Sequence, residues 1–316
     1  MDGIIVVHKE KGFTSFDVVA KLRGILKQKK IGHTGTLDPD ATGVLPVCLG
    51  CATKLCDMLT DTTKVYEAEL LLGVTTDTQD TSGTVLEERA VTVTEEEVRA
   101  VIASFMGEQK QIPPMYSALK VDGKKLYELA REGKIVERKA RDITIGNIEI
   151  LEVKLPKVRM VVTCSKGTYI RTLCNDIGDK LGCGGAMASL IRRKTAGFTL
   201  EEAKTLDEIE ALMKAGEIAT VIKGVDTVFT DCLKAVVKEE YMKAVQNGNW
   251  LYPDMLLLEA DNAEPEDAGN HAAKAETVKV EDIRVYGTDG IFYGVYGYEP
   301  EKKAFKPKKM FFYKVQ

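Results

Sequence analysis

The feature that most constrains this chain is the eight-residue run GHTGTLDP at residues 32–39. Its two glycines permit backbone angles that other residues avoid, and Pro39 lacks an amide donor and restricts the residue before it. The run is therefore predicted to form a loop, and not a helix or a central strand. Leu37 supplies an apolar anchor next to Asp38. The loop is thus suited to presenting the Asp38 carboxylate in a fixed direction.

Two side chains of this loop are candidates for chemistry, and the residues alone leave their roles open. Asp38 is compatible with a nucleophile, with a general base, or with a turn residue that has no chemical role. His33 is compatible with an acid, with a metal ligand, or with a flat ring that takes the place of an extruded nucleobase. No second histidine lies near it in the sequence, which disfavours the metal.

Periodicity predicts the elements around the loop. Residues 3–8 indicate a buried strand, and Thr14 is predicted to cap a helix that ends in the basic run at 27–30. Residues 64–72 alternate, so Tyr66 is expected to point inward on a strand. Strands are also predicted at 143–151 and 158–164. A helix is predicted over 172–181, after a start that carries Arg171.

Residues 109–142 differ from their surroundings. The segment begins with a proline pair that excludes helix, and a lysine-rich helix is predicted around 124–132. Residues 109–171 carry fourteen lysines and arginines against seven acidic residues, whereas the whole chain of 316 residues has a net charge of −4. Charge alone does not decide between a basic binding face and an ordinary solvated surface.

The remaining composition sets limits on location and cofactors. No run of 18 apolar residues exists, and the N-terminus lacks the features of a signal peptide, so a cytoplasmic protein without a membrane span is expected. Cys48, Cys51 and Cys56 have the spacing C-x2-C-x4-C. A zinc or iron–sulfur site would need a fourth, distant ligand, so buried thiols are the preferred interpretation and no metal or cofactor is predicted.

Several motifs occur in an order that resembles the bacterial tRNA pseudouridine synthases that modify uridine 55, the TruB family. The chain contains GHTGTLDPDATGVLPVCLGCATK, KVYEAELLLG, TDTQDTSG, QIPPMYSALKVDGKKLYELAREG and KGTYIRTLCNDIGDKLG in that order. The resemblance as a whole spans residues 3 to about 200. Two departures are His8-Lys9-Glu10, where the family usually has Asp-Lys-Pro, and Asp40, where an apolar residue is common. Neither departure touches the matched catalytic positions.

The resemblance implies a fold class and a domain organisation. The fold is expected to be α/β (α+β), with a mixed, largely antiparallel sheet flanked by helices. Residues 1–231 would form the pseudouridine synthase catalytic domain, with an RNA-gripping insertion at about 109–142. Residues 232–316 would form a small C-terminal β-rich, PUA-like RNA-binding domain. The stretch 259–276 is predicted to be a flexible acidic loop.

The resemblance also implies roles for individual residues. Asp38 matches the catalytic aspartate, Tyr66 the tyrosine that packs on the target base, and Arg171 the arginine paired with the aspartate. His33 matches the histidine that fills the space left by the flipped nucleotide. Tyr169 and Leu190 match positions that line the uracil pocket. Lys9 and Asp80, which are also predicted to bind substrate, and Pro114 match other motif positions.

The predicted function is isomerisation of uridine 55 in the T-arm of tRNA to pseudouridine, with base flipping. Asp38 would either bond to C1′ or promote elimination. The predicted partner is tRNA, with no membrane, no obligate protein partner and a monomeric state. The alternatives are a non-catalytic tRNA-folding or RNA-binding protein and a subunit of an RNA-guided synthase. Intact Asp38, Tyr66 and Arg171 argue against the first, and the short C-terminal tail argues against the second.

Overall fold

The structure is a computed structural model that describes residues 1–121, 123–259 and 282–312. The contacts divide the chain into two compact units. The larger unit comprises Ile5–Val47 and Leu55–Thr220, and the smaller comprises Met1–Ile4, Cys48–Lys54 and Val221–Gln316. The predicted domain boundary at 231/232 stays a prediction. Among the described residues, no helix is both long and apolar enough to cross a membrane.

Most regular structure up to residue 215 belongs to the larger unit. The strands are β1 (Gly3–Lys9), β2 (Ile31–His33), β3 (Thr42–Leu49), β4 (Lys64–Leu72), β5 (Val74–Thr76), β6 (Val85–Glu88), β7 (Gly107–Gln111), β8 (Lys120–Val121), β9 (Lys124–Lys125), β10 (Arg141–Lys154), β11 (Lys157–Cys164), β12 (Gly185–Thr195) and β13 (Phe198–Thr199). The helices are α1 (Ser15–Ile25), η1 (Gly50–Leu55), α2 (Cys56–Thr60), α3 (Glu95–Ala103), α4 (Leu126–Arg131), α5 (Ile170–Lys180) and α6 (Leu206–Ala215).

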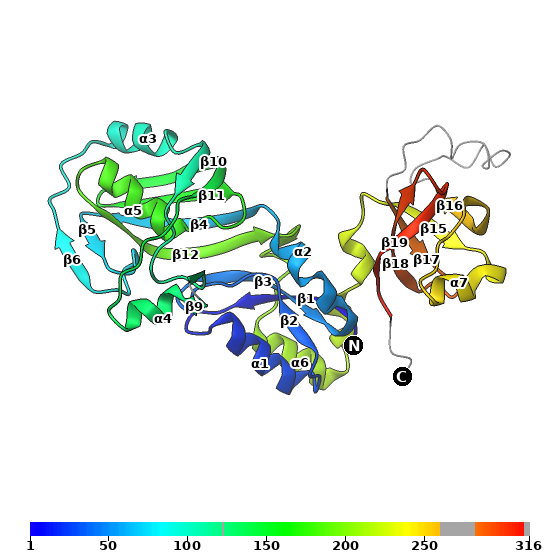
Figure 1. Ribbon diagram of the computed structural model, residues 1–316. Helices are drawn as coiled ribbons and strands as arrows, with labels where there is room; N and C mark the ends of the chain where they lie inside the picture. Colours follow the sequence, from blue (N-terminus) through cyan, green and yellow to red (C-terminus); the bar gives the residue numbers. More distant parts are fainter. Residues whose placement is uncertain (122, 260–281, 313–316) are drawn as a thin grey trace. The chain divides into compact units, whose positions relative to one another are not determined.

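A twisted sheet forms the centre of this unit, with hydrogen-bonded strands in the order β1-β3-β12-β4-β11-β10-β7 (Figure 1). β12 pairs with β3 in parallel, whereas the pairs β12–β4, β4–β11, β11–β10 and β10–β7 are antiparallel. The prediction of a mixed, largely antiparallel sheet is therefore confirmed. The parallel pair brings the segment after the glycine loop beside β12, far along the chain.

The local signals in the sequence produce the expected elements. The Thr14 hydroxyl accepts a hydrogen bond from the Asp17 amide, and the Asp17 carboxylate accepts one from the Thr14 amide, which closes a capping box at the start of α1. Burial alternates along the whole of β4, with Tyr66 on the buried side, as its sequence predicts. The strands expected at 143–151 and 158–164 are the paired β10 and β11.

Helices cover the sheet because their apolar faces need a partner. α5 packs against β12 and β4, and α3 packs against β10 and α5, while α1 contacts α6 (Figure 1). One hydrophobic cluster joins the inward residues of β4, β11 and β12 to α3 and α5. It includes Leu37 of the glycine loop together with Tyr66 and Leu190. The loop is thus anchored to the same core as the strands.

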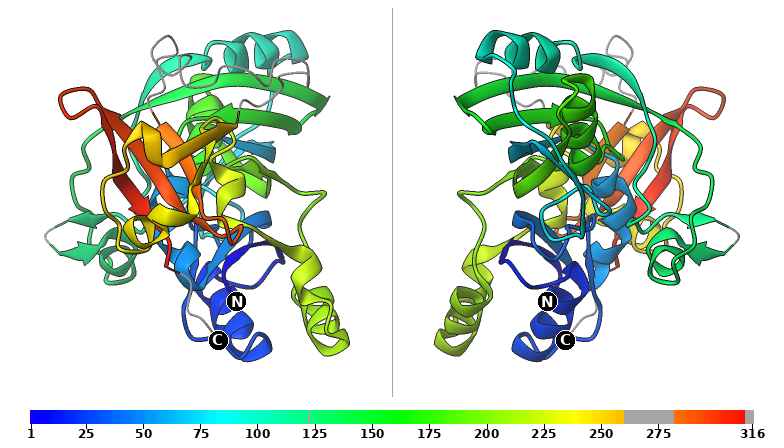
Figure 2. Two further views of the ribbon diagram at one scale, coloured as in Figure 1. Left: turned by 90° about the vertical axis from the view of Figure 1, so that its right-hand side faces the viewer. Right: turned by 90° about the vertical axis from the view of Figure 1, so that its left-hand side faces the viewer.

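The segment predicted as an insertion leaves the edge strand β7. It forms the short hairpin β8–β9 and helix α4, which extend away from the sheet in Figure 2. α4 confirms the helix expected around 124–132. α4 is anchored by the buried side chains of Leu126 and Leu129.

The smaller unit is β-rich, as predicted for the C-terminal part. Its sheet has the order β16-β15-β17-β18-β19 and encloses a separate core that includes Val285 and Tyr296. Along the chain, η2 (Ile218–Val221) is followed by the elements of the smaller unit: β14 (Ile222–Lys223), η3 (Val225–Val228), β15 (Leu233–Val237), η4 (Glu239–Tyr241), α7 (Met242–Gln246), η5 (Pro253–Met255), β16 (Leu256–Glu259), β17 (Asp282–Tyr286), β18 (Phe292–Glu299) and β19 (Ala304–Met310). Apart from residue 259, the predicted acidic loop at 259–276 lies outside the described residues.

Candidate active site

The loop that carries Asp38 is held on both sides of this residue. On one side, the Leu37 amide donates to the hydroxyl of Ser15, the first residue of α1, over 2.9 Å. On the other side, the carbonyl oxygen of Pro39 accepts from the Gly12 amide at 2.9 Å. The Asp38 carbonyl itself accepts from the Ala41 amide at 3.1 Å. The backbone is therefore fixed where the sequence predicted a presenting loop.

Lys9 supports the same loop from beneath. Its side chain is fully buried, and its ammonium donates to the carbonyl oxygens of Glu10, Pro39 and Ala41 at 3.0, 3.1 and 2.6 Å. Burial lowers the pKa of Lys9 to about 8, although the nearby Asp38 carboxylate works in the opposite direction. These three carbonyls use all three protons of the ammonium. The geometry makes Lys9 a support of the loop, and a direct contact with substrate stays a prediction.

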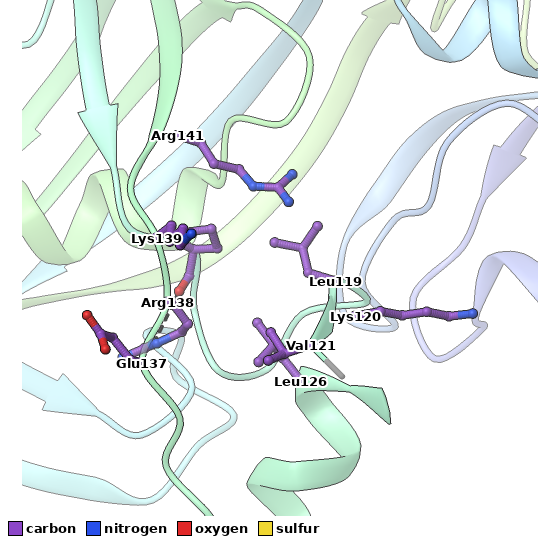
Figure 3. A pocket seen from close by; sticks show the side chains of 9 residues that line it. Leu119, Lys120, Val121, Leu126, Glu137, Arg138, Lys139 and Arg141 are labelled. Atoms are coloured by element: carbon purple, nitrogen blue, oxygen red, sulfur yellow. Dashed lines mark hydrogen bonds between the residues drawn. The ribbon is translucent and has the colours of Figure 1, made fainter. Parts of the chain in front are cut away.

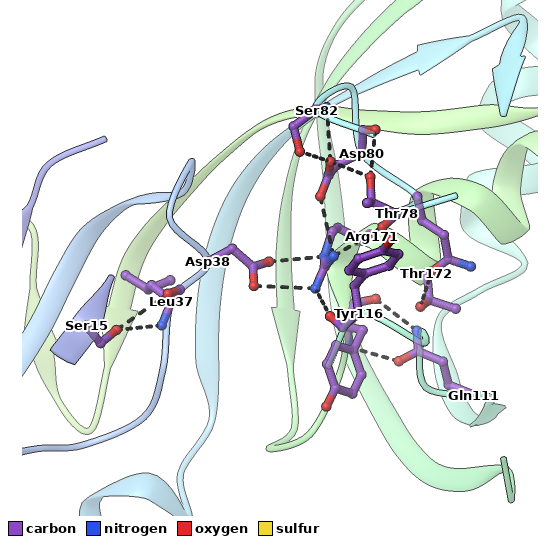
Figure 4. Close-up of polar contacts among 12 residues, drawn as sticks. Ser15, Leu37, Asp38, Thr78, Asp80, Ser82, Gln111, Tyr116, Arg171 and Thr172 are labelled. Atoms are coloured by element: carbon purple, nitrogen blue, oxygen red, sulfur yellow. Dashed lines mark hydrogen bonds and ion pairs between the residues drawn. The ribbon is translucent and has the colours of Figure 1, made fainter. Parts of the chain in front are cut away.

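Asp38 faces Arg171, which lies in the first turn of α5 (Figure 4). The Nε of Arg171 is 3.0 Å from Oδ2 of Asp38, and its Nη2 is 3.4 Å from Oδ1. The Arg171 side chain is only 7% exposed, whereas that of Asp38 is 40% exposed. The carboxylate is therefore held by a buried guanidinium while part of it remains accessible to another molecule.

The other donors of Arg171 are engaged as well. Nη1 donates to the carbonyl oxygen of Thr78 at 3.1 Å and lies 3.4 Å from Oδ2 of Asp80, and Nη2 donates to the carbonyl oxygen of Tyr116 at 2.8 Å. Asp80 is in turn fixed by hydrogen bonds to its Oδ1 from Thr78 and Ser82 (Figure 4). Arg171 thus joins three segments that are distant in sequence.

Two opposing effects set the protonation of Asp38. Burial raises the pKa of its carboxyl group above the ordinary value, and the positive charge of Arg171 counteracts this rise. Asp80 and Asp40 add smaller effects that also raise the pKa. The ion pair with Arg171 therefore limits the rise in the pKa of Asp38.

Three predicted pocket residues lie on elements around this pair. Tyr66 on β4 is 8% exposed, and burial raises the pKa of its hydroxyl. Leu190 on β12 is also 8% exposed and lies opposite Ala68 of β4. Tyr169 precedes α5, and its backbone exchanges two hydrogen bonds with the Gln111 side chain. The Asp38 carboxylate influences the pKa of both Tyr66 and Tyr169, so these three ionisable groups share one electrostatic environment.

His33 ends β2 on the glycine loop and is partly buried. Burial and the positive charge of Arg192 lower its pKa, so the ring is neutral near pH 7. The structure thus places His33 on the loop that carries Asp38, without a contact to that carboxylate among those found in the described part of the chain. Within the same residues, no group of three His, Cys, Asp or Glu side chains is arranged to hold a metal ion.

Three further residues shape the site, and the sequence reasoning missed them. Ser15 holds Leu37, Gln111 holds the backbone of Tyr169, and Arg192 donates to the carbonyl oxygens of Gly35 and Thr36. The helix-capping pattern of TS at 14–15 offered a signal for Ser15. No local signal marks Gln111 or Arg192, because their partners are distant in sequence.

A pocket of about 350 Å³ lies between the hairpin, α4 and the start of β10 (Figure 3). Four cationic side chains and one acidic side chain share its lining with apolar residues: Lys120, Arg138, Lys139, Arg141 and Glu137 beside Pro113, Leu119, Val121 and Leu126. The insertion therefore gathers positive charge in three dimensions as well as in sequence.

Two protein-family models match adjacent parts of the chain. The first, "TruB family pseudouridylate synthase (N terminal domain)", matches residues 23–170, and the second, "tRNA pseudouridylate synthase B C-terminal domain", matches residues 171–230. Asp38 and Tyr66 lie within the first match, and Arg171 is the first residue of the second.

Curated proteins and solved structures agree with these matches. A protein of Lachnoclostridium phytofermentans named tRNA pseudouridine synthase B is 53% identical over 98% of this chain and 100% of its own length. One of Limosilactobacillus reuteri with the same name is 42% identical over 98% and 99%. A crystal structure of a Cbf5-Nop10-Gar1 complex contains a chain with a TM-score of 0.69 and 25% identity, which covers 98% of this chain and 85% of the other.

The chain is therefore a pseudouridylate synthase, an RNA-modifying isomerase. More particularly, the chain belongs to the TruB family of pseudouridylate synthases.

Proposed function

We propose that this protein isomerises uridine 55 in the T-arm of tRNA to pseudouridine, with Asp38 as the catalytic carboxylate. The single observation that carries the proposal is the Asp38–Arg171 pair, in which a buried guanidinium holds a partly exposed carboxylate on a rigid loop. The names of the relatives support a tRNA substrate.

The reaction needs few chemical groups. The N1–C1′ glycosidic bond breaks, the uracil turns, C5 bonds to C1′, and the proton leaves C5 and is replaced at N1. Asp38 either bonds to C1′ or promotes elimination, and both routes require an ionised carboxylate. The charge of Arg171 favours that ionised form and counteracts the effect of burial on the pKa of Asp38. Tyr66 and Leu190 supply an apolar wall that would hold the detached uracil in place.

Access to the base requires that the nucleotide leave its stack. His33 is neutral and lies on the glycine loop, which suits a flat ring that occupies the vacated position. The basic insertion with its pocket suits the RNA backbone, because cationic side chains bind phosphates regardless of sequence. We further propose that the protein acts as a monomer in the cytoplasm, without an obligate protein partner.

The substitution Asp38→Asn tests the proposal, because it keeps the shape of the side chain and removes the charge. We expect the rate of pseudouridine formation on a T-arm transcript to fall at least about 1,000-fold, as for other essential catalytic groups. RNA binding should change little. The matched control is Asp40→Asn in the same loop, which should retain activity.

Site mapping on total unmodified tRNA tests the position. A wild-type rate for Asp38→Asn would refute the assigned role of Asp38, and a modification that avoids uridine 55 would refute the assigned target.

A further inference from the structure

Arg192 is a buried cation that the motifs do not account for. It lies on β12 and is 1% exposed. Its Nε donates to the carbonyl oxygen of Val44 at 2.8 Å, and its Nη2 and Nη1 donate to those of Gly35 and Thr36 at 3.3 and 3.5 Å. A guanidinium has five donors and no acceptor, so its burial requires oxygen atoms around it. Here β3 and the glycine loop provide them.

The sheet register places Arg192 between two strands of the site. It is the partner of Gly43 in the parallel pair of β12 with β3, and of Tyr66 in the antiparallel pair of β12 with β4. A Cβ atom on Gly43 would come within 2.3 Å of the Arg192 carbonyl oxygen, so glycine is required for this close approach. The guanidinium also interacts with the hydroxyl group of Tyr66.

A buried guanidinium is costly to the fold. Within the described residues, its partners are backbone carbonyls and the Tyr66 hydroxyl, and no carboxylate compensates its charge. An apolar side chain of similar volume would avoid the desolvation of a charge. Packing alone therefore does not explain an arginine at this position.

The positive charge of Arg192 acts on the pKa of two neighbouring side chains, His33 and Tyr66. Arg192 lowers the pKa of His33 and counteracts the rise that burial causes in the pKa of Tyr66. Arg192 therefore donates hydrogen bonds to the loop that carries Asp38, and its charge acts on His33 and Tyr66, the two other groups predicted to handle the base.

We infer that Arg192 is a positioning residue for this reaction, which fixes the hydroxyl end of Tyr66 relative to the loop segment immediately before Asp38. The inference rests on the proposed function. Gly35 and Thr36 precede Asp38 by three and two residues, so a shift of their carbonyl groups would move the carboxylate. Displacement of a reacting group by about 1 Å is sufficient to lower a rate 100-fold.

The test compares Arg192→Met, Arg192→Lys and the control Arg193→Met. Arg193 is the next residue on β12, but its side chain is 47% exposed and pairs with Glu67 at the surface. For each variant we would measure the dissociation constant for a T-arm RNA, the single-turnover rate at saturating RNA, and hydrogen exchange of the Leu37 amide. The Leu37 amide reports on the loop through its hydrogen bond to Ser15.

We expect Arg192→Met to lower the saturating rate about 100-fold, to change the dissociation constant less than about threefold, and to accelerate exchange at Leu37. Arg192→Lys should recover part of the rate, because it keeps the positive charge. The recovery should be incomplete, because an ammonium reaches fewer of the carbonyls. Arg193→Met should keep the wild-type saturating rate and exchange.

A folded Arg192→Met protein with a saturating rate and loop exchange within threefold of wild type would overturn the inference, as would weakened RNA binding that explains the whole loss. If Arg192→Met does not fold, Arg192→Lys decides by the same criteria. Failure of the proposed function is distinct, because wild-type protein itself would then form no pseudouridine in the T-arm, while exchange at Leu37 would still report on the loop.

Discussion

At the scale of single residues, Asp38 owes its properties to charges that surround it. Burial raises the pKa of Asp38, and Arg171 offsets part of that rise with a nearly buried positive charge. Because Arg171 is itself fixed by Thr78, Asp80 and Tyr116, its guanidinium does not need to reorganise when a substrate arrives.

Replacement of Arg171 by Met should raise the pKa of Asp38 above its wild-type value, since the main opposing charge is lost. NMR titration of the labelled Asp38 carboxyl carbon would measure the change. The titration of Asp17, which is hydrogen-bonded to Thr14 at the surface, should stay the same and provides the control. An unchanged or lowered midpoint for Asp38 would contradict this account of the pair.

Burial of Lys9 should make the stability of the protein depend on pH. The pKa of Lys9 is about 8 in the folded protein and 10.5 without burial, so the unfolded chain binds more protons between these values. Below pH 8 the Lys9 ammonium is charged in the folded protein, so the full free-energy cost of burying it lowers the stability. As the pH rises toward 10.5, the folded protein holds Lys9 uncharged and this cost is removed. The free energy of unfolding of wild type, relative to Lys9→Met, should therefore increase over this range by at most about 3 kcal/mol. Urea unfolding of both proteins from pH 7 to 10 measures it, and a constant difference would refute the assignment.

At the scale of elements, the site depends on the parallel contact between β3 and β12. Thr42 and Gly43 of β3 pair with Ile191 and Arg192, which sets the end of the glycine loop beside the strand that carries Leu190. β4 lies on the other side of β12 and contributes Tyr66. Adjacent strands thus determine the spacing between the loop and the pocket wall.

Gly43→Ala should disrupt this contact. Gly43 has φ +109°, and an added Cβ would meet the backbone of Arg192. We expect the free energy of unfolding to fall by about 2 kcal/mol or more, together with activity. Gly24→Ala in α1 is the matched control, because nothing lies within 4 Å of its added Cβ. That change should stabilise the protein by roughly 0.5–1 kcal/mol, and equal effects of the two changes in chemical denaturation would contradict the interpretation.

At the scale of the whole molecule, charge is distributed unevenly along a chain whose net charge is only −4. The insertion combines its basic residues with a pocket, whereas α6 carries acidic residues in its first turn. A nearly balanced total charge therefore coexists with a local surface suited to phosphates.

The double variant Lys120→Gln and Lys139→Gln should weaken T-arm binding and reduce its dependence on salt concentration. The affinity falls as salt rises, and each lost phosphate contact makes the slope of log affinity against log salt concentration less steep by about 1. Binding measured from 50 to 200 mM salt provides the slope. Lys214→Gln, which removes a surface lysine paired with Glu210 on α6, should leave the slope unchanged. If both proteins match wild type, the insertion does not bind the RNA backbone.

Much of the fold was predictable because its signals are local. The capping box at Thr14, the alternation of β4 and the loop at 32–39 each depend on residues within a few positions of one another. The resemblance to the TruB family placed Asp38, Tyr66 and Arg171 in one site, although their roles stay predictions. The basic character of the insertion was likewise visible in its composition.

Local patterns in the sequence indicate where the chain bends, which strand faces are buried and which residue types are available for chemistry. Lys9 is enclosed by three carbonyls, Gln111 holds Tyr169, and Arg192 spans β3, β4 and the glycine loop only because distant segments meet in the folded chain. These contacts join residues up to 157 positions apart. They are set by sheet register and burial, which are properties of the folded whole, because a side chain acquires its partners only when distant strands meet.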